Sequence, residues 1–109
     1  MQVGYITLGT NDLERACAFY DELMGSVGFT RIWDDSKLII WGRSMEEAAV
    51  GVTTPWDESP ATVGNGVMVA MQMSNEDEVR SFYDKAMALG ATDEGGPGQR
   101  ISNFYAGYF

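Results

Sequence analysis

The sequence has no histidine, one cysteine and few basic residues, and each shortage excludes a class of function. Without histidine there is no Ser-His-Asp or Cys-His catalysis, no histidine general base and no histidine-ligated metal. Because Cys17 is the single cysteine, an intramolecular disulfide framework is excluded, and a reducing compartment fits. We therefore expect a cytoplasmic protein whose function does not depend on imidazole groups or on paired thiols.

Acidic residues exceed basic ones by 16 to 7, which gives a formal charge of −9. This balance argues against nucleic acid and against anionic membrane surfaces as partners. It favours a neutral or cationic small molecule, although the need for solubility explains it equally well. No apolar run is long enough to suggest a membrane span, and no signal-like segment opens the sequence.

An internal repeat organises what is present. The tripeptide Phe-Tyr-Asp occurs at 19–21 and again at 82–84, an offset of 63 residues, and a methionine follows each copy. A helix-capping pattern precedes each copy and a glycine follows it, which is typical of two copies of one supersecondary unit. A duplicated unit tends to place equivalent strands on either side of a shared cleft, so these strands are where we look for a site.

Propensity and turn residues predict one domain over 1–109, made of two related modules. In the first module, 1–54, Asn11 is expected to cap a helix that stops at Gly25 to Gly28, and strands are expected at 3–10, 29–34, 37–42 and 48–54. A linker follows at 55–65. In the second module, 66–109, Ser74 is expected to cap a helix, a flexible loop is expected at 95–98, and strands are expected at 66–73, 91–94 and 101–109. The second module is therefore one strand short of the first.

These motifs carry a resemblance to a known family. The opening strand around 5–9, the segment Asn-Asp-Leu-Glu-Arg at 11–15 and the pair Phe19-Tyr20 resemble the glyoxalase/bleomycin-resistance/dioxygenase superfamily, also called vicinal oxygen chelate. The strand at 66–71 and the stretch from 96–98 through 104–107 resemble later parts of the same family. The resemblance implies an α+β fold in which two βαβββ modules form curved mixed sheets around a cleft.

In catalytic members of that family the cleft holds a divalent metal, and the resemblance places its ligands at positions Tyr5, Gly51 and Met68, with a fourth on the strand that the second module lacks. A phenol, a glycine and a thioether do not make a zinc, nickel or iron(II) site. We therefore expect no metal, no cofactor and no catalytic residue at these positions.

Alternation along the strands separates a cleft face from a helix-covered face. On the cleft face we expect five residues from the first and last strands of the modules: Tyr5, Thr7, Gly51, Met68 and Gln72. Trp33, Trp41 and Tyr105 are further ligand-binding candidates. A two-residue turn at 35–36 places the two tryptophans on opposite faces of the hairpin, whereas an odd-length turn places them on the same face.

The function that we predict is metal-free binding of a small molecule, neutral or cationic and possibly aromatic, by a homodimer of the bleomycin-resistance type. One alternative is a metal-dependent lyase, isomerase or dioxygenase of the same superfamily. Another is a non-binding interaction domain whose cleft is plugged by Trp41 and Met68. The sequence does not decide whether the protein is an enzyme, but the absence of histidine and the replaced metal-ligand positions argue against it.

Overall fold

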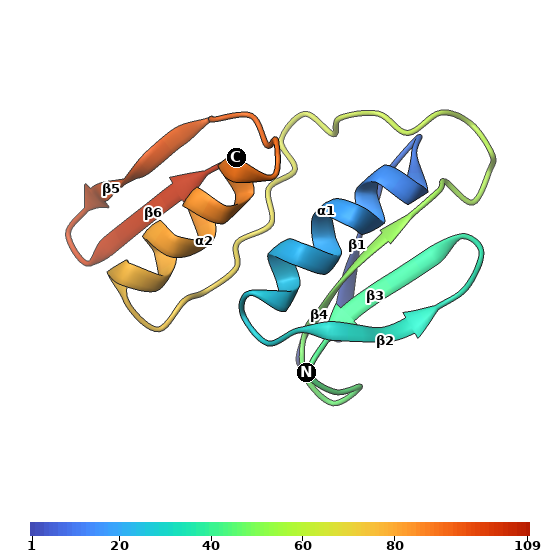
Figure 1. The fold of residues 1–109 in the computed structure, drawn as a ribbon, viewed down its shortest axis with the longest axis horizontal. Coiled ribbons are helices and arrows are strands. Elements are labelled where there is room, and N and C mark those ends of the chain that lie inside the picture. The colour runs from blue at the N-terminus through green and yellow to red at the C-terminus, as the bar shows by residue number, and fades with distance from the viewer. The chain divides into compact units, whose positions relative to one another are not determined.

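Two structural units make up the chain, as Figure 1 shows. The computed structural model describes all residues from 1 to 109 and separates them into Met1–Gly66 and Val67–Phe109. Each unit combines a helix with its own sheet, so the expected α+β class with mixed sheets is confirmed. Neither helix is long and apolar enough to cross a bilayer.

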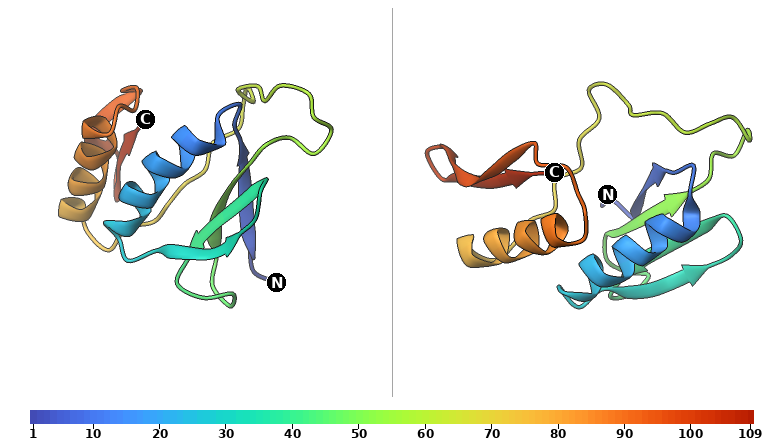
Figure 2. Two further views of the ribbon diagram at one scale, coloured as in Figure 1. Left: turned by 45° about the vertical axis from the view of Figure 1, so that its right-hand side comes forward. Right: turned by 45° about the horizontal axis from the view of Figure 1, so that its top comes forward.

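The first unit contains one helix and a four-stranded sheet in the order β1-β4-β3-β2, and Figure 2 shows α1 lying across the sheet. Strands β1 and β4 run parallel, and the other neighbours are antiparallel. The expected β-α-β-β-β order is confirmed, with strand ends within two residues of the prediction. The elements are β1 (Tyr5–Gly9), α1 (Leu13–Gly25), β2 (Thr30–Asp34), β3 (Leu38–Gly42) and β4 (Ala49–Thr53).

The start of α1 differs from the prediction, because Asp12 and not Asn11 is its N-cap. The Asp12 side chain accepts a hydrogen bond of 3.0 Å from the backbone N–H of Arg15. Asn11 instead binds the loop that follows β4: its Oδ1 accepts from Ala61 N at 2.6 Å and its Nδ2 donates to Ala61 O at 3.0 Å. Both residue types make good caps, so only the tertiary contact decides which one is used.

The core of the first unit lies between α1 and one face of the sheet. Trp41, Leu23, Met24 and Val52 are its largest fully buried side chains. Burying side chains of this size contributes about 1.5 to 3 kcal/mol each to the folded state. Trp41 also donates its indole N–H to Asp21 at 2.9 Å, and its ring lies 5.5 Å from that of Tyr20 on α1. This packing fixes which face of the sheet the helix covers.

The hairpin between β2 and β3 turns through Ser36 and Lys37, one residue later than predicted, because Asp35 N donates to Leu38 O at 3.1 Å. The loop still has two residues. The register is shifted by a bulge between Arg31 and Trp33, and it pairs Trp33 with Ile40 and Arg31 with Trp41. The two tryptophans therefore lie on opposite faces, as the even-length turn implies.

The second unit has a helix, α2 (Glu76–Ala88), and a two-stranded antiparallel sheet of β5 (Gly95–Ile101) and β6 (Phe104–Tyr108). Buried Phe82 and Ala86 project from α2, and the Phe82 ring lies 6.0 Å from that of Phe109. The cap of α2 is Asn75 and not the predicted Ser74, whose backbone N–H donates to the side chain of Glu78 at 2.8 Å.

Two strand predictions and one loop prediction in the second unit are wrong. The predicted loop at 95–98 belongs to β5, where Pro97 is tolerated because it lies at a register shift between Gly95 and Gly98. The predicted strand at 91–94 is absent, and 101–109 is divided between the end of β5 and β6. Residues 67–73 form no strand, since they make no backbone hydrogen bond to another segment. Their exposure nevertheless alternates, with Val69, Met71 and Met73 half-buried.

Candidate ligand-binding face

The face of the first sheet that α1 does not cover brings together four of the predicted site residues. The register pairs Tyr5 with Ala49 and Thr7 with Gly51. It also pairs Gly51 with Ile40, and Ile40 with Trp33. Paired residues project from the same side of a sheet, so one row crosses all four strands: Thr7, Gly51, Ile40 and Trp33. We call this side of the sheet the open face.

The open face has an aliphatic floor with aromatic residues around it. Ile40 and Ala49 are only 3% and 5% exposed, whereas Tyr5 and Trp33 are 52% and 50% exposed. At Gly51 an added Cβ would lie 3.3 Å from Ile40 Cγ1 and from two backbone oxygens. Glycine therefore leaves no side chain projecting from the centre of the row. Half-exposed aromatic rings beside a buried apolar floor are suited to holding a flat molecule by stacking.

A hydrogen bond fixes how Trp33 lies on this face. Its indole N–H donates to Asp35 Oδ2 at 2.8 Å. The other oxygen of Asp35 accepts the backbone N–H groups of Lys37 at 2.7 Å and Leu38 at 2.8 Å. These backbone hydrogen bonds, followed by that from Trp33, hold the pKa of the Asp35 carboxyl below its ordinary value. Asp35 therefore stays ionised beside the ring.

Trp41 is the predicted site residue that the structure places away from the open face. It is 1% exposed and belongs to the core between α1 and the sheet. The other three candidates belong to the second unit. Met68, which is 68% exposed, and Gln72, also exposed, lie on the unpaired segment 67–73. Tyr105 lies on β6, where its hydroxyl accepts from Arg80 at 2.9 Å.

The positions to which the resemblance assigns metal ligands do not suit a metal. Tyr5, Gly51 and Met68 offer a phenol, no side chain and a thioether, which is a poor donor set for the usual divalent ions. No group of three or more cysteine, aspartate or glutamate side chains is arranged to hold an ion elsewhere in the chain. We therefore derive no chemical step that passes through a metal.

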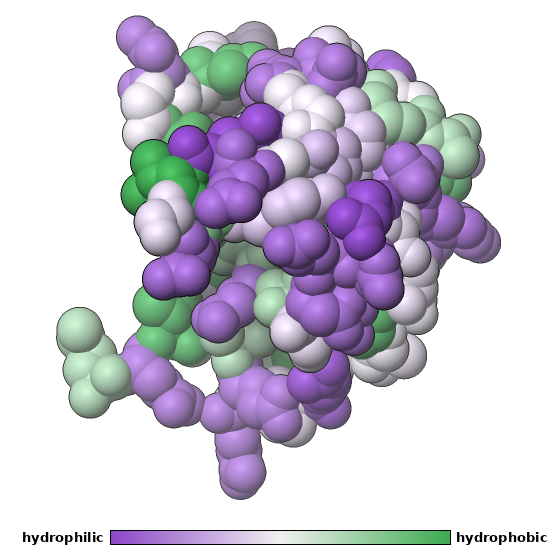
Figure 3. Space-filling model, turned by 90° about the vertical axis from the view of Figure 1, so that its left-hand side faces the viewer, coloured by the Kyte–Doolittle hydropathy of each residue, from purple (hydrophilic) through white to green (hydrophobic).

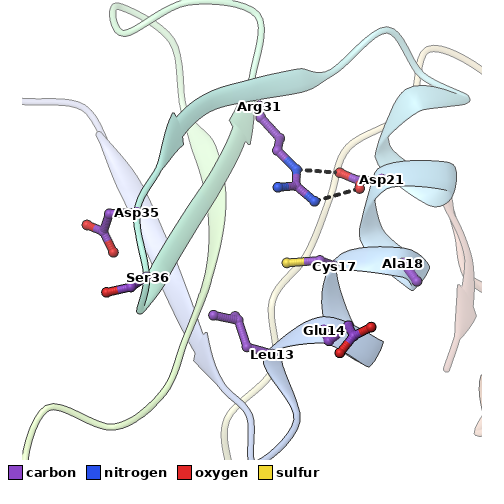
Figure 4. A pocket seen from close by; sticks show the side chains of 8 residues that line it. All are labelled: Leu13, Glu14, Cys17, Ala18, Asp21, Arg31, Asp35 and Ser36. Carbon is purple, nitrogen blue, oxygen red and sulfur yellow. Dashed lines mark hydrogen bonds and ion pairs between the residues drawn. The ribbon is translucent and has the colours of Figure 1, made fainter.

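A groove that the sequence did not reveal lies between α1 and the β2–β3 hairpin, and Figure 4 shows it from close by. Its volume is about 500 Å³, and its walls are the helix residues Leu13, Glu14, Cys17, Ala18 and Asp21 and the hairpin residues Arg31, Asp35 and Ser36. The Arg31 guanidinium is already bound, donating from Nη2 to Asp21 at 2.7 Å and from Nη1 to Asp34 at 2.8 Å.

The side chains that line this groove are poorly suited to catalysis. Burial is the largest cause of a raised pKa at the Cys17 thiol, which keeps the thiol protonated and a poor nucleophile. Hydrogen bonds from Arg31, more than any other group, lower the pKa of Asp21, so this carboxylate remains paired with its partner. The groove therefore offers no group that is poised for reaction.

Comparison with known proteins identifies the class. The family model described as "Glyoxalase/Bleomycin resistance protein/Dioxygenase superfamily" matches residues 2–109, and the chain belongs to this superfamily. No curated protein matches the sequence.

Solved structures agree with this assignment. A glyoxalase/bleomycin resistance protein from Albidiferax ferrireducens is 30% identical, with a TM-score of 0.78, over 89% of this chain and 77% of its own. A glyoxalase-related enzyme from Fulvimarina pelagi is 22% identical, with a TM-score of 0.74, over 99% of this chain and 78% of its own. The bleomycin resistance determinant encoded on transposon Tn5 is 15% identical, with a TM-score of 0.53, over 91% of this chain and 77% of its own. The last two show likeness of fold alone.

Proposed function

We propose that this protein binds a small, flat, neutral or cationic molecule on the open face of its first unit, without a metal and without catalysis. The observation that carries the proposal is the pairing of half-exposed Trp33 and Tyr5 with the buried floor of Ile40 and Ala49. The formal charge of −9 supports a cationic ligand through long-range attraction.

Met68, Gln72 and Tyr105 of the second unit remain proposed ligand-binding residues, considered separately from the open face. We further propose that the protein acts in the cytoplasm, on the strength of its single cysteine. We also propose that it is a homodimer, on the strength of its superfamily membership. On the side that Figure 3 displays, hydrophobic residues form small groups among hydrophilic ones.

The test measures binding of flat aromatic compounds by calorimetry in the wild type and in two tryptophan variants. Trp33→Ala should weaken binding about three- to tenfold, because a stacked ring and any cation–π contact are lost. Trp56→Ala is the matched control, since Trp56 is 91% exposed and lies in the loop after β4. It should leave the affinity unchanged.

Three results would contradict the proposal. They are the absence of binding by any compound in the series, binding that prefers anions, and an equal loss in the two tryptophan variants. Elemental analysis of protein purified without chelators is a separate check, because a stoichiometric transition metal would favour the lyase, isomerase or dioxygenase alternative. Sedimentation velocity tests the homodimer, which a purely monomeric protein would refute.

A further inference from the structure

The three tryptophans differ in what surrounds their rings. Arg31 lies over the Trp41 ring and Lys37 over the Trp56 ring, each at 5.9 Å from the ring centroid. Trp33 carries no arginine or lysine over its ring, although it is half exposed on the open face. Of the three, it is therefore the one with no cation of the protein over either π-face.

The partner of Trp33 is instead a carboxylate. Asp35 Oδ2 accepts the indole N–H at 2.8 Å, so the only hydrogen-bond donor of that side chain is already used. A ligand can then contact Trp33 through its ring face alone. An anion bound at the indole N–H also pushes electron density into the ring, which strengthens its attraction for a cation and leaves apolar stacking nearly unchanged.

We propose that Asp35 is the specificity-determining residue of the open face: it holds the Trp33 ring through the indole N–H and supplies the charge that selects a cationic aromatic ligand over its neutral counterpart. This inference rests on the proposed function. An asparagine at position 35 loses both actions, because its single acceptor oxygen cannot serve the indole as well as the backbone N–H groups of Lys37 and Leu38. The two actions are separated by the ligand instead: release of the ring weakens binding of charged and neutral ligands alike, whereas loss of the charge weakens binding of the cation alone.

The positioning action is tested without a ligand, by NMR of the three indole Nε1–H groups assigned with single Trp→Phe variants. Asp35→Ala should expose the Trp33 N–H to rapid exchange with water, and so should Asp35→Asn, whose single acceptor oxygen is needed by the backbone N–H groups of Lys37 and Leu38. The Trp41 N–H, which donates to Asp21, is the internal control and should not change in either variant. An unaltered Trp33 signal in Asp35→Ala would overturn the positioning role.

The selecting action is tested with two probes of nearly equal size, 1-methylquinolinium and 4-methylquinoline, at pH 8, where the second is uncharged. Asp35→Asn should lower the ratio of the cation affinity to the neutral-probe affinity about three- to fivefold, because both probes lose the positioned ring and the cation alone loses the charge. Asp34→Asn is the control for charge, since Asp34 is the neighbouring carboxylate and pairs with Arg31 on the helix-covered side. It should preserve the ratio of the two affinities.

The outcomes separate this inference from the function beneath it. If both probes bind through Trp33 and their affinity ratio is unchanged in Asp35→Asn, the selecting role of Asp35 is overturned and the binding function stands. An equal fall in the ratio for Asp34→Asn would overturn it too, because bulk charge would then explain the effect. If neither probe binds the wild type, the binding function itself fails, and the selecting role fails with it.

Discussion

The two units have helices with matching bounds but do not share a sheet. Helix α1 covers 13–25 and α2 covers 76–88, so both bounds match the offset of the internal repeat, and the caps Asp12 and Asn75 are equivalent positions. Strand β1 pairs with β4 over five residues, whereas its counterpart at 68–72 has no paired strand. The comparison shows that a repeated sequence reproduces a helix more faithfully than a sheet.

The difference follows from where the hydrogen bonds go. A helix satisfies its backbone groups within its own segment, so the same residues and the same cap suffice wherever they occur. A strand needs a hydrogen-bonded neighbour. In the first sheet β4 lies between β1 and β3, and the second unit has no strand in the equivalent place beside its first segment. Equivalent side chains diverge as well: the ring of Tyr20 lies 5.5 Å from that of Trp41 in the first unit, whereas the hydroxyl of its counterpart Tyr83 donates to Asp93 at 2.6 Å.

Hydrogen exchange should show the largest contrast between the units. Amides of β4 lie between two strands, and we expect them to open only with the whole unit, at about 5 kcal/mol or more. Amides of 67–73 make no hydrogen bond and should exchange at close to the unprotected rate. Strong protection of both segments would mean that 67–73 finds a strand partner in solution, and the contrast would then disappear.

A matched pair of valine variants gives a smaller effect. Val52 on β4 is 1% exposed, so Val52→Ala should cost about 2 kcal/mol of unfolding free energy through lost burial and a residual cavity. Val69 is half-buried on the unpaired segment, so Val69→Ala should lower the unfolding free energy by less than about 1 kcal/mol. Urea unfolding measures both. Tryptophan fluorescence reports the first unit, which holds all three tryptophans, and circular dichroism reports both units. Equal losses of unfolding free energy in the two variants would contradict the contrast between β4 and the unpaired segment.

The smallest effect concerns acid stability. Hydrogen bonds from Arg31, chiefly, lower the pKa of Asp21 below its ordinary 3.8, and the Tyr83 hydroxyl, chiefly, lowers that of Asp93. A lowered folded-state pKa contributes stability that is present above the ordinary value and is lost as the pH falls through the folded value. Asp21→Asn should therefore reduce the loss of stability below about pH 4 by no more than about 1 kcal/mol, because solvent screens this half-exposed pair.

The control for this measurement is Asp93→Asn, whose carboxylate is held by a neutral hydroxyl and a backbone N–H in place of a guanidinium. It should change the acid side of the stability curve less than Asp21→Asn does. Urea midpoints between about pH 5 and about pH 2 give the comparison, and an unchanged curve for Asp21→Asn would show that the Arg31 pair carries no stability.

Part of the candidate site could be found from sequence. Alternation along β1 and β4 was sufficient to place Tyr5, Thr7 and Gly51 on one face, because their helix-side neighbours are uniformly apolar. The even-length turn separated Trp33 from Trp41 but could not say which tryptophan is buried. That choice depends on Asp21 and Tyr20 of α1, which lie about twenty residues away along the chain. The bond from Trp33 to Asp35 had a local signal, an aspartate opening a two-residue turn, which the sequence reading did not use.

The sequence by itself determined the helices, the repeat, the α+β class and the family, because each depends on local periodicity, local caps and the order of short motifs. Only the tertiary structure decided that Asn11 holds Ala61 instead of capping α1, that Gly95 begins a strand and that 67–73 does not form one. Those outcomes depend on partners that are distant in the sequence. The stability of a strand, a buried indole or a hydrogen-bonded side-chain amide depends mainly on the group that it contacts, and the intrinsic propensity of the residue contributes much less.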